Sequence, residues 1–244
     1  MSSDTASSQS PDVSEQMQVR LDKRARIIAD GGQAYPVDLL RDHTLVQVRQ
    51  KYTDDTGELT LAPGEETTDE VTVGGRVVFV RNTGKLCFAS LQDGFTETSN
   101  GERLQIMLSK AEVGDESLAA WKSDIDLGDH VWVRGRVVVS RRGELSIMAA
   151  EWRMASKALR PLPTLHKELS EESRVRRRYA DLVVREESRQ MVRTRALITR
   201  AVRRALDERG FLEIETPILQ LVHGGAAARP FNTHLNAFDI DMSL

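Results

Sequence analysis

The sequence predicts an α+β protein built around a five-stranded OB-fold β-barrel with an N-terminal helix. Between Val71 and Trp152 apolar residues recur at every second position in five short segments, which is the period of half-buried strands. A helical segment at 116–129 separates the third segment from the fourth. A helix at that place among five short strands is typical of a Greek-key OB barrel, and a five-stranded sandwich fragment is the alternative.

Alternation assigns an inner and an outer face to each expected strand. The five strands are residues 71–81, 85–93, 103–109, 130–139 and 144–152. Small and branched apolar side chains are expected to fill the interior from the second and third strands: Cys87, Ala89, Leu91, Leu104, Ile106 and Leu108. In the fourth strand Val131 and Val133 share one face, and His130 and Trp132 share the other.

The chain divides into regions of different composition. We expect a disordered tail at 1–14, a helix and loop-rich connector at 15–70, the barrel domain at 71–155, a linker at 156–187 and an incomplete second domain at 188–244. The first helix should end at Gly31-Gly32. Further helices are predicted at 171–183 and 188–209, and strands at 211–217 and 239–244.

Charge is balanced overall but unevenly distributed. The net charge is −3, yet residues 53–70 contain seven acids and no base, while residues 160–204 contain thirteen bases and six acids. Such a basic stretch is expected where a protein meets phosphate, and a solvated helix face with local ion pairs is the alternative. No apolar run is long enough to span a membrane and no secretory signal is present, so we expect a soluble, cytoplasmic protein.

Four polar or aromatic residues are expected on the outer side of the barrel. They are Arg81, Phe88, Gln105 and Glu144. OB barrels bind single strands by stacking bases on exposed aromatic rings and reading base edges with polar side chains. The alternatives are that Phe88 is covered or buried and that Gln105 and Glu144 are ordinary surface residues.

Catalytic motifs and metal-binding motifs are absent from the sequence. The single cysteine, Cys87, lies in an apolar strand and excludes an internal disulfide, so an inert core thiol is expected. The five histidines lack metal-ligand spacing, and no phosphate-binding loop occurs. We therefore assign no catalytic residue and no metal ligand.

Four stretches of the sequence are distinctive: GKLCFASLQD at 84–93, GELSI at 143–147, RGFLEIETP at 209–217 and GGAAARPFNTHLNAFDIDM at 224–242. Together they resemble the bacterial-type, and most closely the actinobacterial, class II lysyl-tRNA synthetases. The resemblance covers nearly the whole chain from about residue 18, up to and including motif 1 of the class. It implies a lysine–tRNA ligase, with lysine tRNA, lysine and ATP as partners and Mg²⁺ as cofactor.

The resemblance also implies roles for individual residues. Phe88 would stack on an anticodon base of the uridine-rich lysine anticodon, and Arg81, Gln105 and Glu144 would hydrogen-bond the bases. Gly224 would lie beside the lysine substrate. Residues of motif 1 would form a homodimer interface at the start of the antiparallel catalytic domain: Arg209, Gly210, Phe211, Glu215 and Pro217.

The family continues into motifs 2 and 3, whereas this sequence stops at Leu244 within an expected strand. We therefore expect an N-terminal fragment that retains anticodon binding, binds ATP and Mg²⁺ poorly and does not aminoacylate by itself. The alternatives are a stand-alone, non-catalytic tRNA-binding module and the synthetase portion of a lysyl-transferring relative that modifies membrane lipids.

Overall fold

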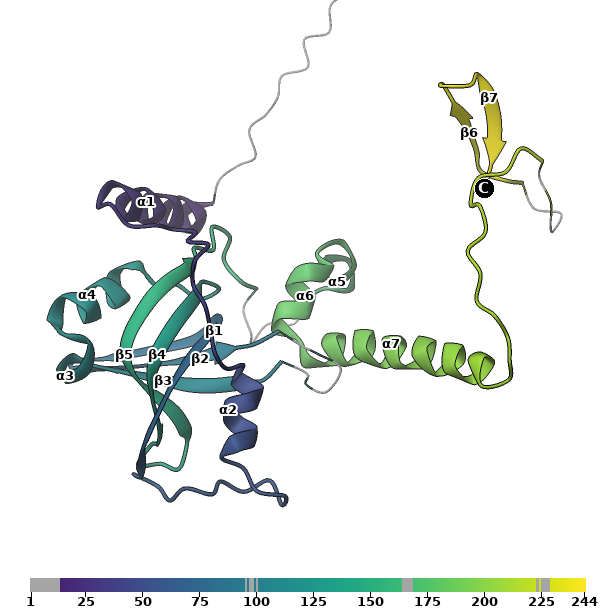
Figure 1. Ribbon diagram of the computed structural model, residues 1–244. Helices are drawn as coiled ribbons and strands as arrows, with labels where there is room; N and C mark the ends of the chain where they lie inside the picture. The colour runs from purple at the N-terminus through teal and green to yellow at the C-terminus, as the bar shows by residue number, and fades with distance from the viewer. Residues whose placement is uncertain are drawn as a thin grey trace, which may run out of the picture. The chain divides into compact units, whose positions relative to one another are not determined.

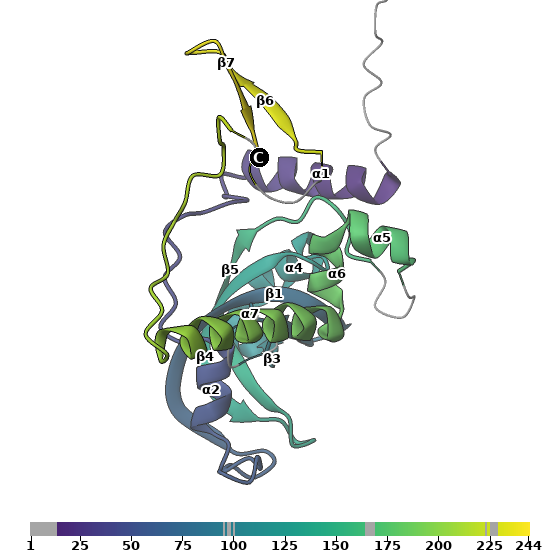
Figure 2. The ribbon, with the colours of Figure 1, turned by 90° about the vertical axis from the view of Figure 1, so that its right-hand side faces the viewer.

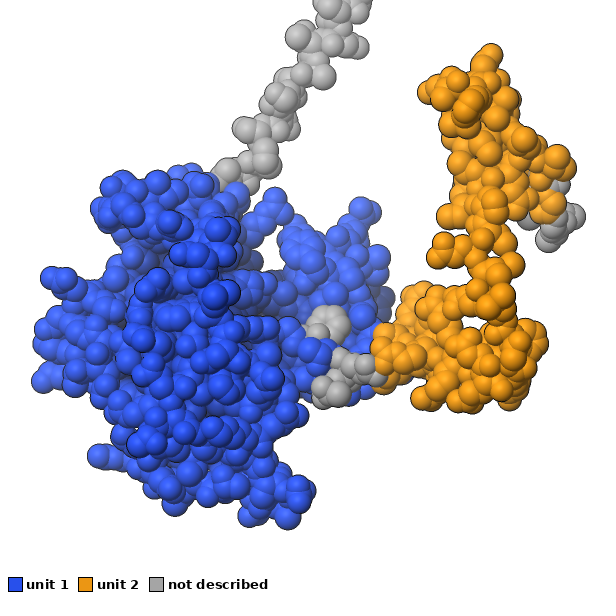
Figure 3. Space-filling model, in the orientation of Figure 1, with its two compact units in different colours: residues 1–194 blue, residues 195–244 orange. Residues whose placement is uncertain are grey.

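A computed structural model describes residues 14–94, 96, 99, 101–163, 169–222, 224 and 229–244, so most of the expected tail at 1–14 lies outside the described residues. The chain divides into two compact units, residues 1–194 and residues 195–244 (Figure 3). Each unit is described by itself. The division lies inside the long helix α7 (Glu186–Asp207).

The first unit contains the predicted barrel. Its strands are β1 (Glu66–Thr83), β2 (Leu86–Gln92), β3 (Arg103–Ser109), β4 (His130–Val139) and β5 (Leu145–Ser156). They close in the order β1-β2-β3-β5-β4, with antiparallel pairs except for the parallel pair of β3 and β5 (Figure 1). Helices α3 (Lys110–Val113) and α4 (Asp115–Asp124) lie between β3 and β4 in the chain, which confirms the predicted helix placement.

The barrel interior is apolar, as the alternation predicts. Every interior side chain expected from β2 and β3 is at most 1% exposed. Trp121 of α4 is fully buried with them and contacts Trp152 of β5 edge to face, with ring centroids 5.1 Å apart. Since buried aromatic side chains contribute much of the apolar area of a small core, α4 is part of the barrel's core.

One glycine of β4 permits a close approach of two strands. A Cβ atom at Gly135 would lie 2.0 Å from the carbonyl oxygen of Met148 on β5. The register of β4 and β5 shifts between Arg134 and Gly135, which marks a β-bulge. The backbone contact explains why a glycine interrupts the valine face of this strand.

A bulge in β1 changes which residues face outward. Val77 pairs with Leu91 and Phe79 pairs with Ser90, so one extra residue of β1 is accommodated between them. Both Val77 and Val78 are buried, whereas Phe79 is exposed. Because the bulge shifts the alternation by one position, Phe79 and the residues that follow it are on the opposite face from strict alternation.

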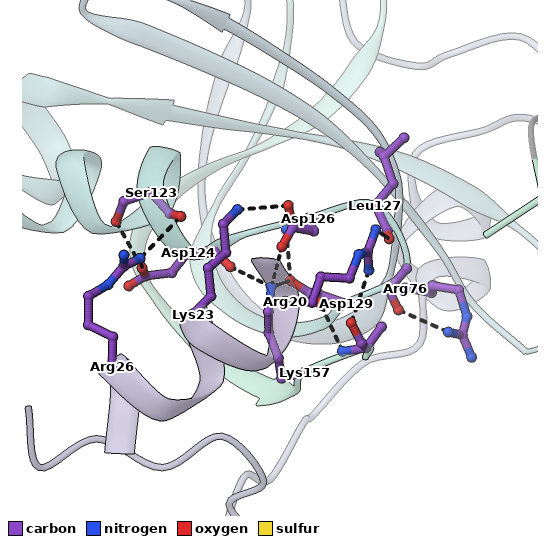
Figure 4. A network of polar contacts seen from close by, with 12 residues as sticks. Arg20, Lys23, Arg26, Arg76, Ser123, Asp124, Asp126, Leu127, Asp129 and Lys157 are labelled. Atoms are coloured by element: carbon purple, nitrogen blue, oxygen red, sulfur yellow. Dashed lines mark hydrogen bonds and ion pairs between the residues drawn. The ribbon is translucent and has the colours of Figure 1, made fainter. Parts of the chain in front are cut away.

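Helix α1 (Glu15–Ala29) is fastened to the loop between α4 and β4 (Figure 4). Arg20 donates hydrogen bonds to the carbonyl oxygens of Leu127 and Ala158, and Arg26 forms an ion pair with Asp124. From the other side, Lys157 is 2% exposed and its Nζ donates to Asp129 Oδ2 at 2.7 Å. The loop is therefore held by α1 from outside and by a buried lysine from within.

The connector before the barrel contains a helix that the sequence analysis did not predict. Helix α2 (Leu45–Lys51) begins at Thr44, whose side chain and that of Gln47 form a capping box. In both ribbon views α1 and α2 lie toward opposite ends of the barrel (Figures 1 and 2). The acidic stretch that follows α2 belongs partly to β1, where Glu66 forms an ion pair with Arg136 and Glu70 with Arg134.

The basic stretch is partly neutralised within the protein. Helices α5 (Glu171–Arg176) and α6 (Arg178–Val184) replace the single helix predicted at 171–183, and α6 carries the fully buried Asp181. The carboxylate of Asp181 lies within 3.8 Å of Arg174, Arg178 and Arg185. For these three arginines the alternative of local ion pairing is confirmed.

The second unit contains the end of α7 and a hairpin of β6 (Asn232–Leu235) and β7 (Ile240–Ser243). Strand β7 confirms the strand expected at 239–244, whereas the strand predicted at 211–217 is wrong: these residues are extended, exposed and unpaired with any described strand. Apolar alternation cannot make a strand there, because backbone groups must pair with a neighbouring strand.

Candidate nucleic-acid interface

The four candidate residues lie on neighbouring strands of the barrel, and each is at least partly accessible. Arg81 is on β1, Phe88 on β2 and Gln105 on β3, while Glu144 immediately precedes β5. Arg81 and Glu144 are exposed, and Phe88 and Gln105 are half-buried. Phe88 is thus not fully buried, and part of its ring is covered by Arg81.

Arg81 and Phe88 are in direct contact. They are paired across β1 and β2, and the guanidinium carbon of Arg81 lies 4.9 Å from the centroid of the Phe88 ring. A guanidinium at this distance is attracted by the ring's negative face. The contact places a planar cation over an aromatic ring, and the two groups together could stack a base and contact phosphate or a base edge.

Gln105 is oriented by hydrogen bonds from the neighbouring strand. Its Nε2 donates to Ser146 Oγ at 2.9 Å, and Ser146 Oγ donates to the Glu144 carbonyl oxygen at 2.9 Å. Among the described residues none donates to Gln105 Oε1 or to the Glu144 carboxylate. The amide oxygen and the carboxylate are therefore available as acceptors beside the ring.

The strand register gives the spacing between these groups. Phe88 pairs with Met107, and Ser90 pairs with Gln105, so Gln105 is a diagonal neighbour of Phe88. Diagonal neighbours on a sheet lie about 7–8 Å apart and are within reach of long side chains. Two cavities of about 340 Å³ border the barrel, and none of the four residues lines either. The candidate site is thus an open strand surface, as expected for a single-strand binder rather than for a small-molecule pocket.

Phe79 also faces this surface, which strict alternation along β1 does not predict. Phe79 is 54% exposed and pairs with Ser90, the residue that lies between Phe79 and Gln105 in the sheet. Strict alternation places Phe79 on the side of Val77, and only the bulge in β1 reverses it. No signal in the sequence marks the position of that bulge.

The candidate residues of motif 1 lie at the end of α7 and beyond it. Gly210 has a φ of 82° and its N–H donates to the Asp207 carbonyl oxygen, so it ends the helix in the left-handed conformation that glycine favours. Arg209 donates to the Ala205 carbonyl oxygen, and Phe211, Glu215 and Pro217 are exposed. Gly224 is also exposed, and residues 225–228 lie outside the described residues.

Other chemistry has little support in the residues that the structure describes. Burial raises the pKa of the Cys87 thiol, which therefore remains protonated and is a poor nucleophile. Within the described ranges no group of three or more His, Cys, Asp or Glu side chains could hold a metal ion. No helix of the described part is long and apolar enough to cross a membrane.

Two parts of the chain match models of known protein families. Residues 71–155 match the OB-fold nucleic acid binding domain. Residues 170–243 match the tRNA synthetases class II (D, K and N). The first match has the bounds expected for the barrel domain.

Individual relatives share much of the sequence. The lysine–tRNA ligase of Kineococcus radiotolerans is 59% identical over 96% of this chain, and lysine–tRNA ligase 1 of Mycobacterium tuberculosis (strain H37Rv) is 55% identical over 98%. The chain spans 44% and 45% of these two relatives' lengths. A lysylphosphatidylglycerol biosynthesis bifunctional protein of Rhodococcus jostii is 41% identical over 94% of this chain, which spans 19% of that relative.

Proposed function

We propose that this chain is the anticodon-reading part of a lysine–tRNA ligase. The proposal is supported by the matches to an OB-fold nucleic-acid-binding domain and to part of a class II tRNA synthetase domain. Its partner is lysine tRNA, and the whole ligase uses lysine and ATP in the cytoplasm. The observation that carries the proposal is the contact of Arg81 with Phe88 beside the oriented amide of Gln105.

The surface is chemically complementary to uracil. Uracil offers one N–H donor between two carbonyl acceptors, and its ring can stack on Phe88. Gln105 Oε1 and the Glu144 carboxylate are acceptors for that N–H, while the Arg81 guanidinium is a donor for a carbonyl. A carboxylate at an RNA-binding surface is unfavourable next to phosphate, so its presence favours a role in reading a base edge.

Phe88→Ala tests the stacking role. Removing the ring should weaken binding of an RNA hairpin whose loop carries the anticodon UUU by about 1–3 kcal/mol, the usual contribution of one stacked base. The measurement is fluorescence anisotropy of the labelled hairpin. Phe88→Leu, which keeps apolar volume but has no ring, should show most of the same loss.

A matched pair of arginine variants separates a specific contact from general charge. Arg153 lies 5.4 Å from the ring of Trp132 elsewhere on the barrel, so Arg81→Ala and Arg153→Ala each remove one cation beside an aromatic ring. Arg81→Ala should weaken hairpin binding and Arg153→Ala should leave it almost unchanged. Equal losses, or unchanged affinity in Phe88→Ala, would remove this surface from the proposed site.

The exposed apolar face of α7 supports the proposed homodimer. Met191, Ile198, Val202 and Leu206 are all exposed and recur at the spacing of one helix face. In class II synthetases motif 1 forms the dimer interface, and we propose that this face and residues 209–217 do so here.

The catalytic reaction is proposed for the whole ligase only. We assign no step of lysine activation to the described residues. We expect the 244 residues by themselves to give no lysine-dependent exchange of ATP with pyrophosphate. The two alternatives are a stand-alone tRNA-binding module and the synthetase portion of a protein that lysinylates lipids. Both predict the same RNA surface.

A further inference from the structure

We infer that Phe79 is a second stacking surface, which holds the anticodon-loop base adjacent to the base on Phe88. This inference rests on the proposed function, because it extends the same RNA surface by one nucleotide. The Phe79 side chain is 54% exposed and lies outside the apolar core of the barrel. A stacked base would give this exposed ring a partner.

The bulge in β1 is what presents the ring. Val77 and Val78 are both buried, at 0% and 4% exposure, and the chain then turns Phe79 outward opposite Ser90. Val80, which follows, packs against the core, and Arg81 is again outward. Bulges recur next to binding sites because they re-aim a side chain without ending the strand.

The neighbours of Phe79 leave its ring available. The residue opposite it on β2 is Ser90, whose small side chain cannot cover an aromatic ring. Next along the same row is Gln105 on β3, and beyond it Ser146 on β5. Ser146 is buried and holds the Gln105 amide, so a base stacked on Phe79 would have the Ser90 hydroxyl and the Gln105 amide oxygen in line with one of its edges.

The spacing of the two rings fits successive bases. Phe79 and Phe88 are diagonal neighbours across β1 and β2, since Phe79 pairs with Ser90 and Phe88 lies two residues before it on the same face. Such positions lie about 7–8 Å apart, which is too far for one base to stack on both rings but close enough for two bases joined by one phosphate. Arg81, on the same face of β1, lies between them in the chain and contacts the Phe88 ring.

The test combines protein variants with abasic RNA. Phe79→Ala, Phe88→Ala and the unchanged chain are titrated with the UUU hairpin and with hairpins that lack one loop base at a time. Phe79→Ala should weaken binding of the intact hairpin at least about fivefold. Removal of one particular loop base should then not weaken binding of Phe79→Ala any further. That base should be adjacent to the base whose removal does not weaken binding of Phe88→Ala any further.

The outcomes separate this inference from the proposed function. If Phe88→Ala weakens binding and Phe79→Ala does not, the inference fails and the function stands. If neither variant weakens binding, the proposed function fails. A loss in Phe79→Ala that is not coupled to any loop base also overturns the inference, because the ring then acts only on the fold. Phe79→Tyr, which keeps a ring, should bind like the unchanged chain.

Discussion

Replacing Lys157 with Met should unfold the barrel at a much lower concentration of urea. The Lys157 ammonium is fully buried and donates to the Asp124 carbonyl oxygen at 2.6 Å, to Asp126 Oδ2 at 2.6 Å and to Asp129 Oδ2 at 2.7 Å. Methionine has a similar length and fills the space, but it leaves three acceptors without their donor. The variant therefore removes charge while changing packing little.

The size of the effect follows from Asp129. This carboxylate is 0% exposed, and its remaining partners are the backbone N–H groups of Asp126 and Ala158. Removing one partner of a buried ion pair costs about 3–5 kcal/mol, because the other charge stays buried without compensation. With a urea m-value of about 2 kcal/mol per molar, the midpoint should fall by roughly 2 M.

Tryptophan fluorescence reports the transition, since Trp121 is in the core and contacts Trp152. Lys23→Met is the matched control: Lys23 forms a single ion pair with Asp126, is partly exposed, and should cost about 1 kcal/mol or less. A cost within 1 kcal/mol of the control at pH 7 would refute the reasoning.

Two further predictions concern pH and assembly. Burial and, to a smaller extent, the charge of Arg76 lower the pKa of His130 to about 4. Between pH 6.5 and pH 4 the imidazole is therefore protonated in the unfolded chain but not in the folded one. The free energy of unfolding should decrease as the pH is lowered through this window, by at most about 1.4 kcal/mol per pH unit. In urea unfolding, the His130→Gln variant should lose this pH dependence of the free energy of unfolding. A pH dependence equal to that of the unchanged chain would contradict the prediction. Ile198→Glu places a charge on the apolar face of α7 and should weaken dimerisation by about 2 kcal/mol, or about 30-fold, in sedimentation experiments. Ala196→Glu, on the opposite face, is the control, and equal effects of both variants would reject that interface.

The barrel could be predicted from sequence because the alternation within each strand shows which of its side chains point into the barrel. The six interior residues expected from β2 and β3 are all buried, since a period of two needs no knowledge of neighbouring strands. The same alternation placed Phe88 and Gln105 outside the barrel. Which residues contact which, however, depends on register, and register is a property of strand pairs.

The features that the sequence did not predict correctly depend on contacts between segments or on very short segments. The bulge between Val77 and Phe79 inserts one residue into β1 and moves the later side chains of the strand to the opposite face of the sheet. Strict alternation therefore predicts the wrong face for Phe79. Residues 211–217 alternate like a strand but have no described partner to pair with. Helix α2 has only seven residues, about two turns, so an apolar pattern repeats too few times in it to indicate a helix. The spacing of Thr44 and Gln47 is nevertheless that of a capping box.

The buried carboxylate of Asp181 has a consequence for how strongly salt should affect RNA binding. Each phosphate that a protein neutralises releases bound counterions, and the dependence of affinity on salt counts those contacts. Arg174, Arg178 and Arg185 already share the charge of Asp181, so they release fewer counterions than their number in the sequence implies. The salt dependence should therefore report the contacts made by the barrel surface more than the density of arginines after it.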